Sequence, residues 1–226
     1  MSRPDPGVAT GRPGVAAFDF DGTLTQRDTL VPFLRRACGP WSIARAAFAA
    51  RRSPGRDALK VALVGELFRG WPAARLDSLG RAHVPTLLAA LRPGSLDRLD
   101  WHQRRGHAVV IVSASLGAYL RPLADRLGLD GALAVELVAD AGGTLTGEVV
   151  GGLNNRGPEK VARLNAWIDA RFGPGTEVEL WAYGDSPGDA ELLAIADHPT
   201  WVGRRAARTE WSQWATSAAS ARRRRP

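Results

Sequence analysis

Short, uninterrupted apolar runs alternate along the chain with longer segments in which apolar residues recur every three or four positions. The apolar runs lie at 14–20, 107–113, 132–139, 178–183 and 200–202. Runs of this length without polar alternation are typical of strands that are buried on both faces. Helical spacing is found between them, at 95–105, 116–127, 158–172 and 190–196. The alternation predicts an α/β fold with a doubly wound parallel sheet covered by helices on both faces.

One long segment interrupts this alternation after the first predicted strand. Residues 29–91 contain no strand pattern, and helices are predicted at 41–52, 58–68 and 73–91. Gly70-Trp71-Pro72 and Arg92-Pro93-Gly94 supply the breaks that end two of these helices. We interpret 29–91 as a small α-helical cap inserted into a core made of 14–28 and 92–215.

Three further segments have a distinct composition. Gly142-Gly143 and Gly151-Gly152 bracket 144–150, which predicts a small antiparallel arm. Residues 1–13 are rich in Pro and Gly and predict a flexible leader. Residues 216–226 predict a solvated basic tail.

Composition narrows the class of protein. The formal net charge is +7, but the 30 basic residues are widely spread and only Lys60 and Lys160 are lysines, which argues against nucleic-acid binding. Cys38 is the only cysteine, which excludes an internal disulfide and a cysteine-built zinc site. No run reaches the roughly 18 apolar residues of a membrane span, and the N-terminal residues lack the apolar run of a signal peptide. We therefore expect a soluble, cytoplasmic protein.

Acidic residues follow the first predicted strand directly, in the sequence Asp19-Phe20-Asp21-Gly22-Thr23. Ligands of doubly wound sheets bind beyond the carboxyl ends of the strands, where these side chains would lie. Gly22 lets the backbone turn there. Two neighbouring carboxylates repel each other unless a cation or a shared proton offsets their charge.

Three more chemical groups follow in order along the chain. The strand at 107–113 ends in Ser113, which is followed by Ala114-Ser115. Lys160 lies near the start of a predicted helix, and the strand at 178–183 leads into Gly184-Asp185-Ser186-Pro187-Gly188-Asp189.

This set of four motifs resembles the haloacid dehalogenase superfamily over roughly residues 14–205. The helical insert and the phrase GPEKVARL at 157–164 are similar to the phosphoserine-phosphatase-like branch. The resemblance implies a Rossmann-like core and a Mg²⁺-dependent phosphatase. It would hydrolyse a small organic phosphate monoester, from a small phosphorylated metabolite, through an aspartyl-phosphate intermediate.

The resemblance also implies the catalytic roles. Asp19 would be the nucleophile, and Asp21 would protonate the leaving alkoxide and then deprotonate the attacking water. Ser113 and the backbone N–H of Ala114 would bind phosphoryl oxygens, and Lys160 would supply positive charge. Arg156 precedes Lys160 by four residues and is the alternative cation.

For Mg²⁺, the resemblance implies an all-oxygen site, which this hard cation prefers. Asp19 and Asp185 would be ligands, together with the backbone carbonyl of Asp21. Asp189 would bind the metal directly or through water. Gly188 departs from the branch, which commonly has Asn at this position.

Asp28 and Lys60 fall where the branch carries a Glu and an Arg that grip the amine and carboxylate of serine. Asp is one methylene shorter and Lys lacks the bidentate fork of Arg, so phosphoserine is a doubtful substrate. The structural alternatives are a helix N-cap for Asp28 and a solvated helix face for Lys60.

Two other functions stay open at this stage. The basic segment 41–52 contains Trp41 and would suit a phosphatase of lipid head groups, such as phosphatidylglycerophosphate, in peripheral contact with a membrane. A non-catalytic protein that binds phosphate ligands is the second alternative. The sequence leaves the oligomeric state undetermined.

We expect the aromatic residues and the histidines to have structural and not catalytic roles. Trp41, Phe68 and Trp71 are expected to pack inside the cap, and Trp211 and Trp214 to staple a final helix to the core. The histidines show no metal-ligand spacing and are expected at the surface or at helix caps; they are His83, His102, His107 and His198.

Overall fold

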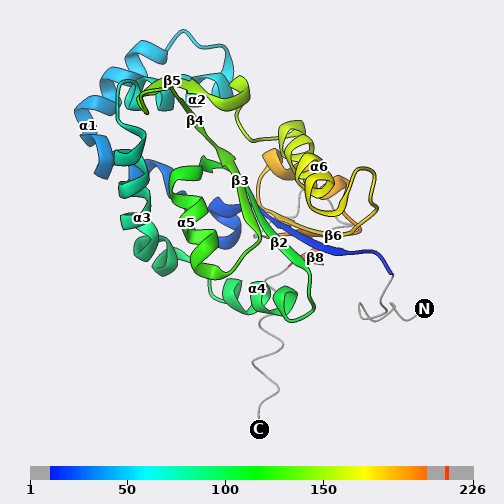
Figure 1. Cartoon of the computed structure of the whole chain (residues 1–226). Helices are drawn as coiled ribbons and strands as arrows, with labels where there is room; N and C mark the ends of the chain where they lie inside the picture. Colours follow the sequence, from blue (N-terminus) through cyan, green and yellow to red (C-terminus); the bar gives the residue numbers. More distant parts are fainter. Residues whose placement is uncertain (1–10, 203–211, 214–226) are drawn as a thin grey trace.

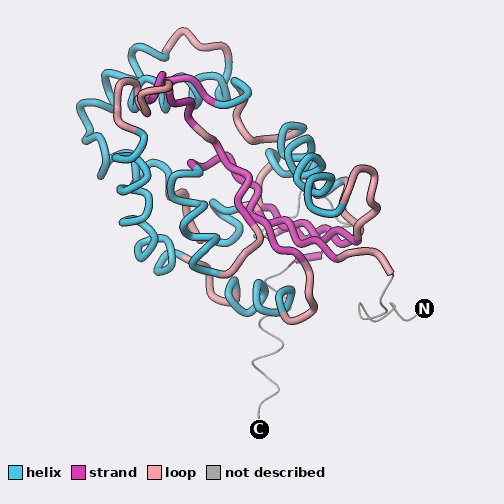
Figure 2. Tube along the Cα trace, viewed as in Figure 1, coloured by secondary structure: helices cyan, strands magenta, loops and turns pink. Residues whose placement is uncertain are grey.

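A parallel six-stranded sheet forms the centre of the computed structural model, which describes residues 11–202 and 212–213 (Figures 1 and 2). Its strand order is β3-β2-β1-β6-β7-β8. The strands are β1 (Gly14–Phe18), β2 (Ala108–Leu116), β3 (Gly131–Val135), β6 (Glu179–Gly184), β7 (His198–Trp201) and β8 (Ser212–Gln213). The first strand lies between β2 and β6, so its carboxyl end opens at the middle of the sheet.

Both faces of the sheet are buried, because alternate residues of each strand point to opposite sides. Ala16 and Phe18 join one apolar cluster, which includes residues of α4 (Ser95–Gln103) and α5 (Gly117–Leu127). Val15 and Ala17 join a second cluster, which includes residues of α6 (Pro158–Phe172) and α7 (Ala190–Ala194). The predicted doubly wound parallel sheet is confirmed.

The segment between the first two strands folds into α1 (Leu30–Ala50), α2 (Gly55–Phe68) and α3 (Ala73–Ala90). An antiparallel bridge between Thr25 and Leu91 brings together the points where the chain leaves the core and returns to it. Gly39 has a φ of 75° and precedes Pro40, and together they break α1 near its middle.

These inserted helices are not separated from the core by a solvent layer. Phe33 of α1, Phe68 of α2 and Leu87 of α3 belong to the same apolar cluster as Phe18 of the sheet. On α3, Gly80 faces α5 so closely that a Cβ there would collide with the carbonyl oxygen of Ala118. The insert therefore shares its hydrophobic core with the sheet.

The predicted continuous strand at 132–139 is wrong. β3 ends at Val135, and β4 (Leu137–Ala139) leaves the main sheet to pair antiparallel with β5 (Leu145–Val149). Tertiary contacts cause the change, since the β4–β5 arm lies against the insert. Gly70 N donates to Leu145 O and Leu145 N donates to Trp71 O, both at 2.8 Å. A predicted boundary shifts as well, because β2 continues past Ser113 to Leu116.

The expectation that the histidines lie at the surface or at caps is wrong for His83 and His102, which are 4% and 0% exposed. His102 Nε2 lies 2.9 Å from the Tyr183 hydroxyl, and its Nδ1 lies 2.8 Å from His107 Nδ1. The Tyr183 hydroxyl accepts a hydrogen bond from Arg98. It can therefore donate its own hydrogen to His102, which then donates through Nδ1 to His107.

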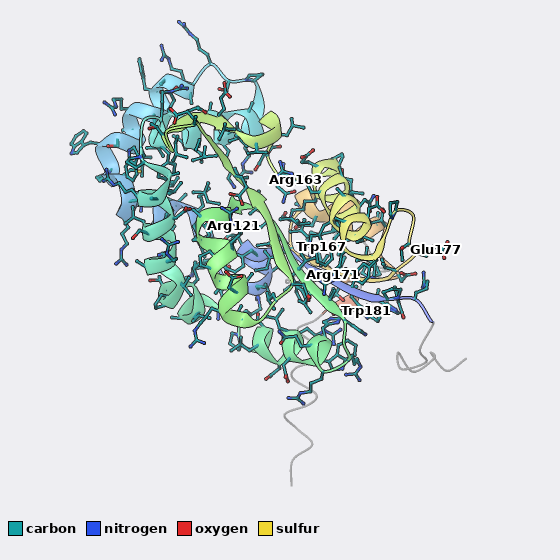
Figure 3. The ribbon with its side chains drawn as sticks, in the orientation of Figure 1. Arg121, Arg163, Trp167, Arg171, Glu177 and Trp181 are labelled. Carbon is teal, nitrogen blue, oxygen red and sulfur yellow. The ribbon has the colours of Figure 1, made fainter. Side chains whose placement is uncertain are left out.

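Aromatic neighbours surround both buried histidines. The His102 ring lies edge-on to the Trp181 ring at a centroid distance of 5.6 Å (Trp181 is labelled in Figure 3), and the His83 ring lies 5.2 Å from the Phe33 ring. These contacts remove the apolar surface of each imidazole from water. Trp41, which we expected to pack, is instead 87% exposed, while Phe68 is fully buried. Trp211 and Trp214 lie outside the described residues.

We predict that His102 makes the protein sensitive to mild acid. Burial, with smaller contributions from Arg98 and His107, lowers the pKa of His102 to about 2. The unfolded chain takes up a proton on this histidine below about pH 6.5, so stability falls by roughly 1.4 kcal/mol per pH unit below that value.

Urea denaturation of the wild-type protein and of His102→Gln, from about pH 7.5 down to about pH 5, tests this linkage. The difference in unfolding free energy between the two proteins should shrink as the pH falls. A constant difference would show that another group is responsible.

Candidate active site

The proposed nucleophile lies at the carboxyl end of β1, at the centre of the sheet. Asp19 N donates to Tyr183 O at 2.9 Å, which extends the β1–β6 pairing by one residue. A single turn, η1 (Phe20–Leu24), follows and turns the chain away from the sheet. Gly22 has a φ of 86°, and a Cβ there would collide with the Asp185 carboxylate. This glycine therefore lets the turn after β1 approach the loop after β6.

A buried ion cluster joins three elements at this edge. Lys160 Nζ lies 2.6 Å from Asp19 Oδ1 and 2.6 Å from Asp189 Oδ1, and its side chain is 3% exposed. Burial acts to lower the pKa of Lys160, but the two carboxylates outweigh it and raise that pKa. Burial and the Asp189 charge raise the pKa of Asp19 to about 7, against the opposing effect of Lys160.

The start of α6, which carries Lys160, is tied to the sheet by a second basic residue. Arg163 donates to Ala134 O in β3 at 2.7 Å and to Glu159 Oε1 at 2.7 Å (Figure 3). These bonds hold the first turn of α6 against the strand edge. The ammonium group of Lys160 is therefore placed by the backbone as well as by its ion pairs.

The acidic side chains also form a group that fits a divalent cation. Oxygen atoms of Asp19, Asp185 and Asp189 lie within 4.8 Å of one another. The Thr23 hydroxyl lies between two of them, 3.1 Å from Asp19 Oδ2 and 3.4 Å from Asp185 Oδ1. Burial and then the Asp189 charge raise the pKa of Asp185 to about 6. Three carboxylates crowd together here, and one ammonium group does not offset all of their charge. Their oxygen atoms are the ligands that a hard cation such as Mg²⁺ prefers.

Both carboxylate oxygens of Asp189 already have partners. Oδ1 accepts from Lys160, while Oδ2 accepts from Asp185 N, Ser186 N and the Ser186 hydroxyl at 3.2, 3.0 and 2.8 Å. A Cβ on Gly184 would collide with this side chain. Of the three carboxylates, that of Asp189 therefore has the least capacity left to bind a metal directly.

Asp21 lies in a different environment from Asp19. Its Oδ1 accepts from Thr29 N and from the Thr29 hydroxyl, both at 2.7 Å, and its Oδ2 accepts from the Ser115 hydroxyl. Burial raises the pKa of Asp21, although these hydrogen bonds act to lower it. The carboxylate is thus held by neutral donors from β2 and from the entry to the insert.

Sequence reasoning did not assign roles to Thr23, Thr29 or Ser115. The sequence could have predicted Ser115, because it follows Ser113 by two residues along a strand and so lies on the same face. Ser113 is buried, and its hydroxyl accepts from Ser115 N at 3.2 Å. Thr29 had no comparable signal, since its contact with Asp21 depends on how the chain folds back after the η1 turn.

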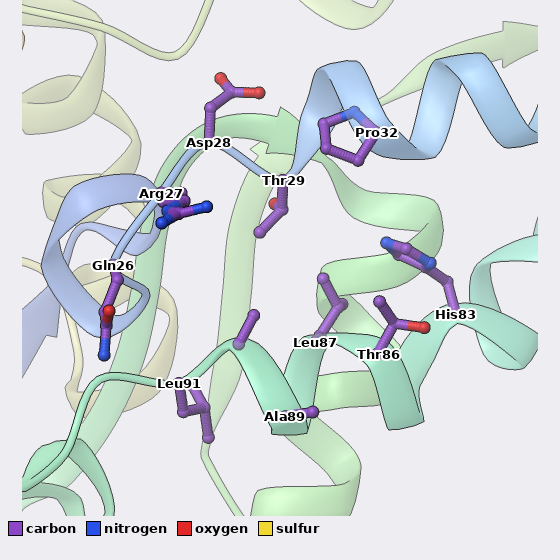
Figure 4. Close-up of a pocket in the computed structure, with 11 residues that line it drawn as sticks. Gln26, Arg27, Asp28, Thr29, Pro32, His83, Thr86, Leu87, Ala89 and Leu91 are labelled. Carbon is purple, nitrogen blue, oxygen red and sulfur yellow. The ribbon is translucent and has the colours of Figure 1, made fainter.

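The two expected substrate-binding side chains are placed differently. Lys60 lines a small hollow together with Ala114 and Asn154, among other residues. Burial lowers the pKa of Lys60, and the nearby charges of Asp21 and Asp28 partly oppose this effect. Asp28 is exposed and accepts from Val31 N at 2.9 Å, as a residue at a helix start does. Figure 4 shows its carboxylate directed away from the neighbouring cavity.

Arg156 does not join the ion cluster. It pairs with Asp57 of α2 at 3.5 Å, and Asn154 donates to the same carboxylate at 2.7 Å. Arg156 also packs over Gly188, where a Cβ would collide with its side chain. The glycine that replaces the Asn of the resembled branch therefore makes room for Arg156, and the cation in contact with Asp19 is Lys160.

A cavity of about 320 Å³ lies between residues 26–29 and α3 (Figure 4). His83 lines it, and the buried Nδ1 of this histidine has no hydrogen-bond partner within residues 11–202. Thr29, which holds Asp21, lines the same cavity. The cavity thus adjoins the hinge at which the insert joins the core.

The two lysines of the chain provide a matched test of the ion cluster. We predict that Lys160→Met costs about 3–5 kcal/mol of stability, because it leaves two buried carboxylates without their counterion. Lys60→Met should cost far less, since Lys60 forms no ion pair within residues 11–202. Urea denaturation near neutral pH measures both changes, and equal losses would contradict the assigned role of Lys160.

Comparisons with known proteins agree with this geometry. The family model described as haloacid dehalogenase-like hydrolase matches residues 16–194. Protein CicA of Caulobacter vibrioides is 36% identical over 205 residues, which cover 87% of this chain and 89% of CicA. Both matches rest on the sequence alone, and each covers most of the chain.

Solved structures show the same fold at low identity. A protein of unknown function from Bordetella pertussis Tohama I has a TM-score of 0.69 at 21% identity, with 93% of this chain and 96% of that chain covered. A phosphoserine phosphatase, in a structure described as a phospho-aspartyl intermediate analogue, has a TM-score of 0.54 at 21% identity, with 85% and 86% covered. By its sequence match and its fold, the chain belongs to the haloacid dehalogenase-like hydrolase family.

Proposed function

We propose that this protein is a Mg²⁺-dependent phosphatase that hydrolyses a small organic phosphate monoester through a phosphoaspartyl intermediate on Asp19. The observation that carries the proposal is the placement of Asp19 at the end of β1, with Lys160 on one carboxylate oxygen and Asp185 nearby. Membership in a hydrolase family supports the reaction class.

The first chemical step would form a bond between an Asp19 carboxylate oxygen and phosphorus. Lys160 occupies Oδ1, which leaves Oδ2, beside Thr23, as the oxygen more open to attack. The bond from phosphorus to the substrate oxygen breaks, and Asp21 gives its proton to the departing alkoxide. In the second step water attacks phosphorus, Asp21 takes the proton, and phosphate leaves with Asp19 restored.

The environments of the two carboxylates suit different tasks. Asp19 faces an ammonium group, which favours the ionised form that a nucleophile needs. Asp21 faces hydroxyl and amide donors, and burial raises its pKa toward that of a general acid. Because Thr29 belongs to the entry of the insert, movement there would change the hydrogen bonds that hold Asp21.

Positive charge would be needed around the phosphoryl group. When bound, Mg²⁺ would screen the repulsion between Asp19 and the phosphate dianion, with Asp19, Asp185 and the backbone carbonyl of Asp21 as its protein ligands. The Ser113 hydroxyl and the backbone N–H of Ala114 would donate to phosphoryl oxygens.

Lys60 would contact the part of the substrate beyond the phosphate. It borders the same hollow as Ala114 and has no ion pair among the described residues. A single ammonium group accepts many anionic partners, so a small phosphorylated metabolite with a second negative group fits this position. The hydrogen bond of Asp28 to the start of α1 weakens its candidacy as a second substrate contact.

A lipid head-group phosphate is the second candidate substrate. The observation that favours it is the exposed aromatic surface of α1, which carries Trp41 at 87% exposure. A non-catalytic role in binding phosphate ligands would leave the separate environments of Asp19 and Asp21 without a purpose.

Replacement of the nucleophile is the first test. Asp19→Asn keeps the side-chain shape but removes the attacking charge, so hydrolysis of a generic aryl phosphate with saturating Mg²⁺ should fall by several orders of magnitude. Wild-type protein should also acquire acid-stable label from a phosphorus-labelled substrate, and the variant should not. Asp97→Asn on α4 is the matched control and should behave as wild type. Substantial turnover by Asp19→Asn would exclude the covalent mechanism.

A second comparison separates acid–base chemistry from metal binding. Asp21→Asn should abolish most turnover yet leave Mg²⁺ affinity nearly unchanged, because the proposed ligand at this position is the backbone carbonyl. Asp185→Asn should weaken Mg²⁺ binding and recover part of its activity at high Mg²⁺. Calorimetric titration measures the affinities, and indistinguishable titrations of the two variants would overturn these roles.

A further inference from the structure

An aromatic and basic surface lies on the outer side of α1. Trp41 is 87% exposed and Phe48 is 66% exposed. They are seven residues apart, almost two full helical turns, so they project from the same side of the helix. Ala44 and Arg45 are also exposed on this side. We call this surface, together with Arg51 and Arg52 just after the helix, the outer face of α1.

The segment that carries the outer face is basic and has no acidic residue. Residues 29–56 contain six arginines and no aspartate or glutamate. All six arginines are exposed, and none forms a salt bridge with residues 11–202; they are Arg35, Arg36, Arg45, Arg51, Arg52 and Arg56. The Arg51 guanidinium lies 3.6 Å from the centre of the Phe48 ring. Aromatic rings and guanidinium groups are therefore interleaved on one surface.

Packing inside the molecule does not explain this surface. The opposite side of α1 supplies buried residues, among them Phe33 and Ala46, and these meet the needs of the hydrophobic core. A Trp and a Phe left in water cost free energy that smaller or polar residues would avoid. An exposed aromatic pair with arginines beside it indicates a partner that is both apolar and negatively charged.

The shape and charge of the outer face favour one partner over others. A second copy of the chain is disfavoured, because face-to-face contact would bring two sets of unpaired arginines together. Single-stranded nucleic acids are bound in grooves, whereas α1 lies at the edge of the molecule as a projecting helix (Figure 1). An anionic bilayer offers phosphates for the arginines and a headgroup region into which indole and phenyl rings insert.

We propose that the outer face of α1 docks the protein peripherally on an anionic lipid bilayer. Trp41 and Phe48 would enter the headgroup region, and Arg45, Arg51 and Arg52 would contact lipid phosphates. Within residues 11–202 and 212–213, no helix is long and apolar enough to cross a membrane. With only two large apolar side chains, the attachment would be shallow, reversible and sensitive to salt.

The docking surface is connected to the candidate active site through the next helix. α2 begins at Gly55, directly after the basic turn, and its first turn places Asp57 against Asn154 and Arg156. Lys60, one turn further along, lines the hollow beside Ala114. A docked protein would thus hold this rim of the site near the lipid surface. The docking itself does not depend on the proposed catalysis.

Co-sedimentation of the full chain with vesicles tests the proposal. We expect binding to phosphatidylcholine vesicles that contain about 40% phosphatidylserine, and little binding to pure phosphatidylcholine. Since each basic residue at an anionic surface contributes a factor of roughly five, Arg45→Gln with Arg52→Gln should lower the partition coefficient about thirtyfold. Trp41→Ala with Phe48→Ala should lower it at least about tenfold at constant charge. Circular dichroism confirms that both double variants remain folded.

Matched variants isolate the surface. Leu96→Ala with Arg104→Gln changes an exposed apolar residue on α4 and the exposed arginine that follows this helix, and should bind as wild type. Glutamine at Arg222, Arg223, Arg224 and Arg225 tests the basic C-terminal segment, and should leave most of the binding in place. Asp19→Asn should bind vesicles normally, so that loss of catalysis and loss of docking are distinguishable.

Four results would overturn the proposal. The first is that the Trp41/Phe48 double variant binds vesicles as strongly as the wild-type protein does. The second is binding that the C-terminal arginines carry alone. The third is a shift from dimer to monomer in the Trp41/Phe48 variant during sedimentation, which would identify the outer face as a contact between two copies. Binding to a DNA oligonucleotide without any binding to vesicles would likewise assign the arginines to nucleic acid.

Discussion

The buried contact of Lys160 with Asp19 and Asp189 is the interaction on which the arrangement of the site depends. An ammonium group in the interior is stable only with carboxylates close by, and each of these carboxylates in turn needs the ammonium group. The contact joins the end of β1, the start of α6 and the loop after β6. Other features serve it: Gly22 and Gly184 lack the Cβ atoms that would keep Asp185 and Asp189 away. Asp189 also binds backbone amides of its own loop.

A second carboxylate, only two residues from Asp19, is held by quite different means. Asp21 accepts hydrogen bonds from Thr29 and Ser115, and no cation of the described part of the chain is in direct contact with it. The short turn after β1 thus places the Asp19 carboxylate in the ion cluster and the Asp21 carboxylate beside the entry of the helical insert. Burial raises the pKa of both carboxylates, and at Asp19 the charge of the Lys160 ammonium group opposes this effect. In this family of hydrolases, such a division would supply a nucleophile and an acid from one turn of chain.

The insert has two sides with different physical character. Its inner side shares apolar residues with the sheet and brings Asp57 and Lys60 to the rim of the site. Its outer side carries exposed aromatic rings and exposed arginines that form no salt bridge with residues 11–202. The β4–β5 arm, which comes from the second half of the chain, forms backbone hydrogen bonds with Gly70 and Trp71, between α2 and α3. The surroundings of the site are therefore built from segments that lie far apart in the sequence.

The sequence by itself determined the alternation of buried strands and helices and the helical segment after the first strand, whereas the grouping of Asp19, Lys160, Asp185 and Asp189 was expected from the family resemblance. These features are local, because the period of apolar residues and the residues at strand ends can be read within a short window. Only the tertiary structure decided which neighbours each group meets. The run at 132–139 changes partner after Val135, although its hydropathy does not change there. His102 is buried because Trp181 and Tyr183 surround it, and Trp41 is exposed because α1 turns its other side to the core. Arg156 pairs with Asp57 because side chains from distant segments meet only after the chain has folded.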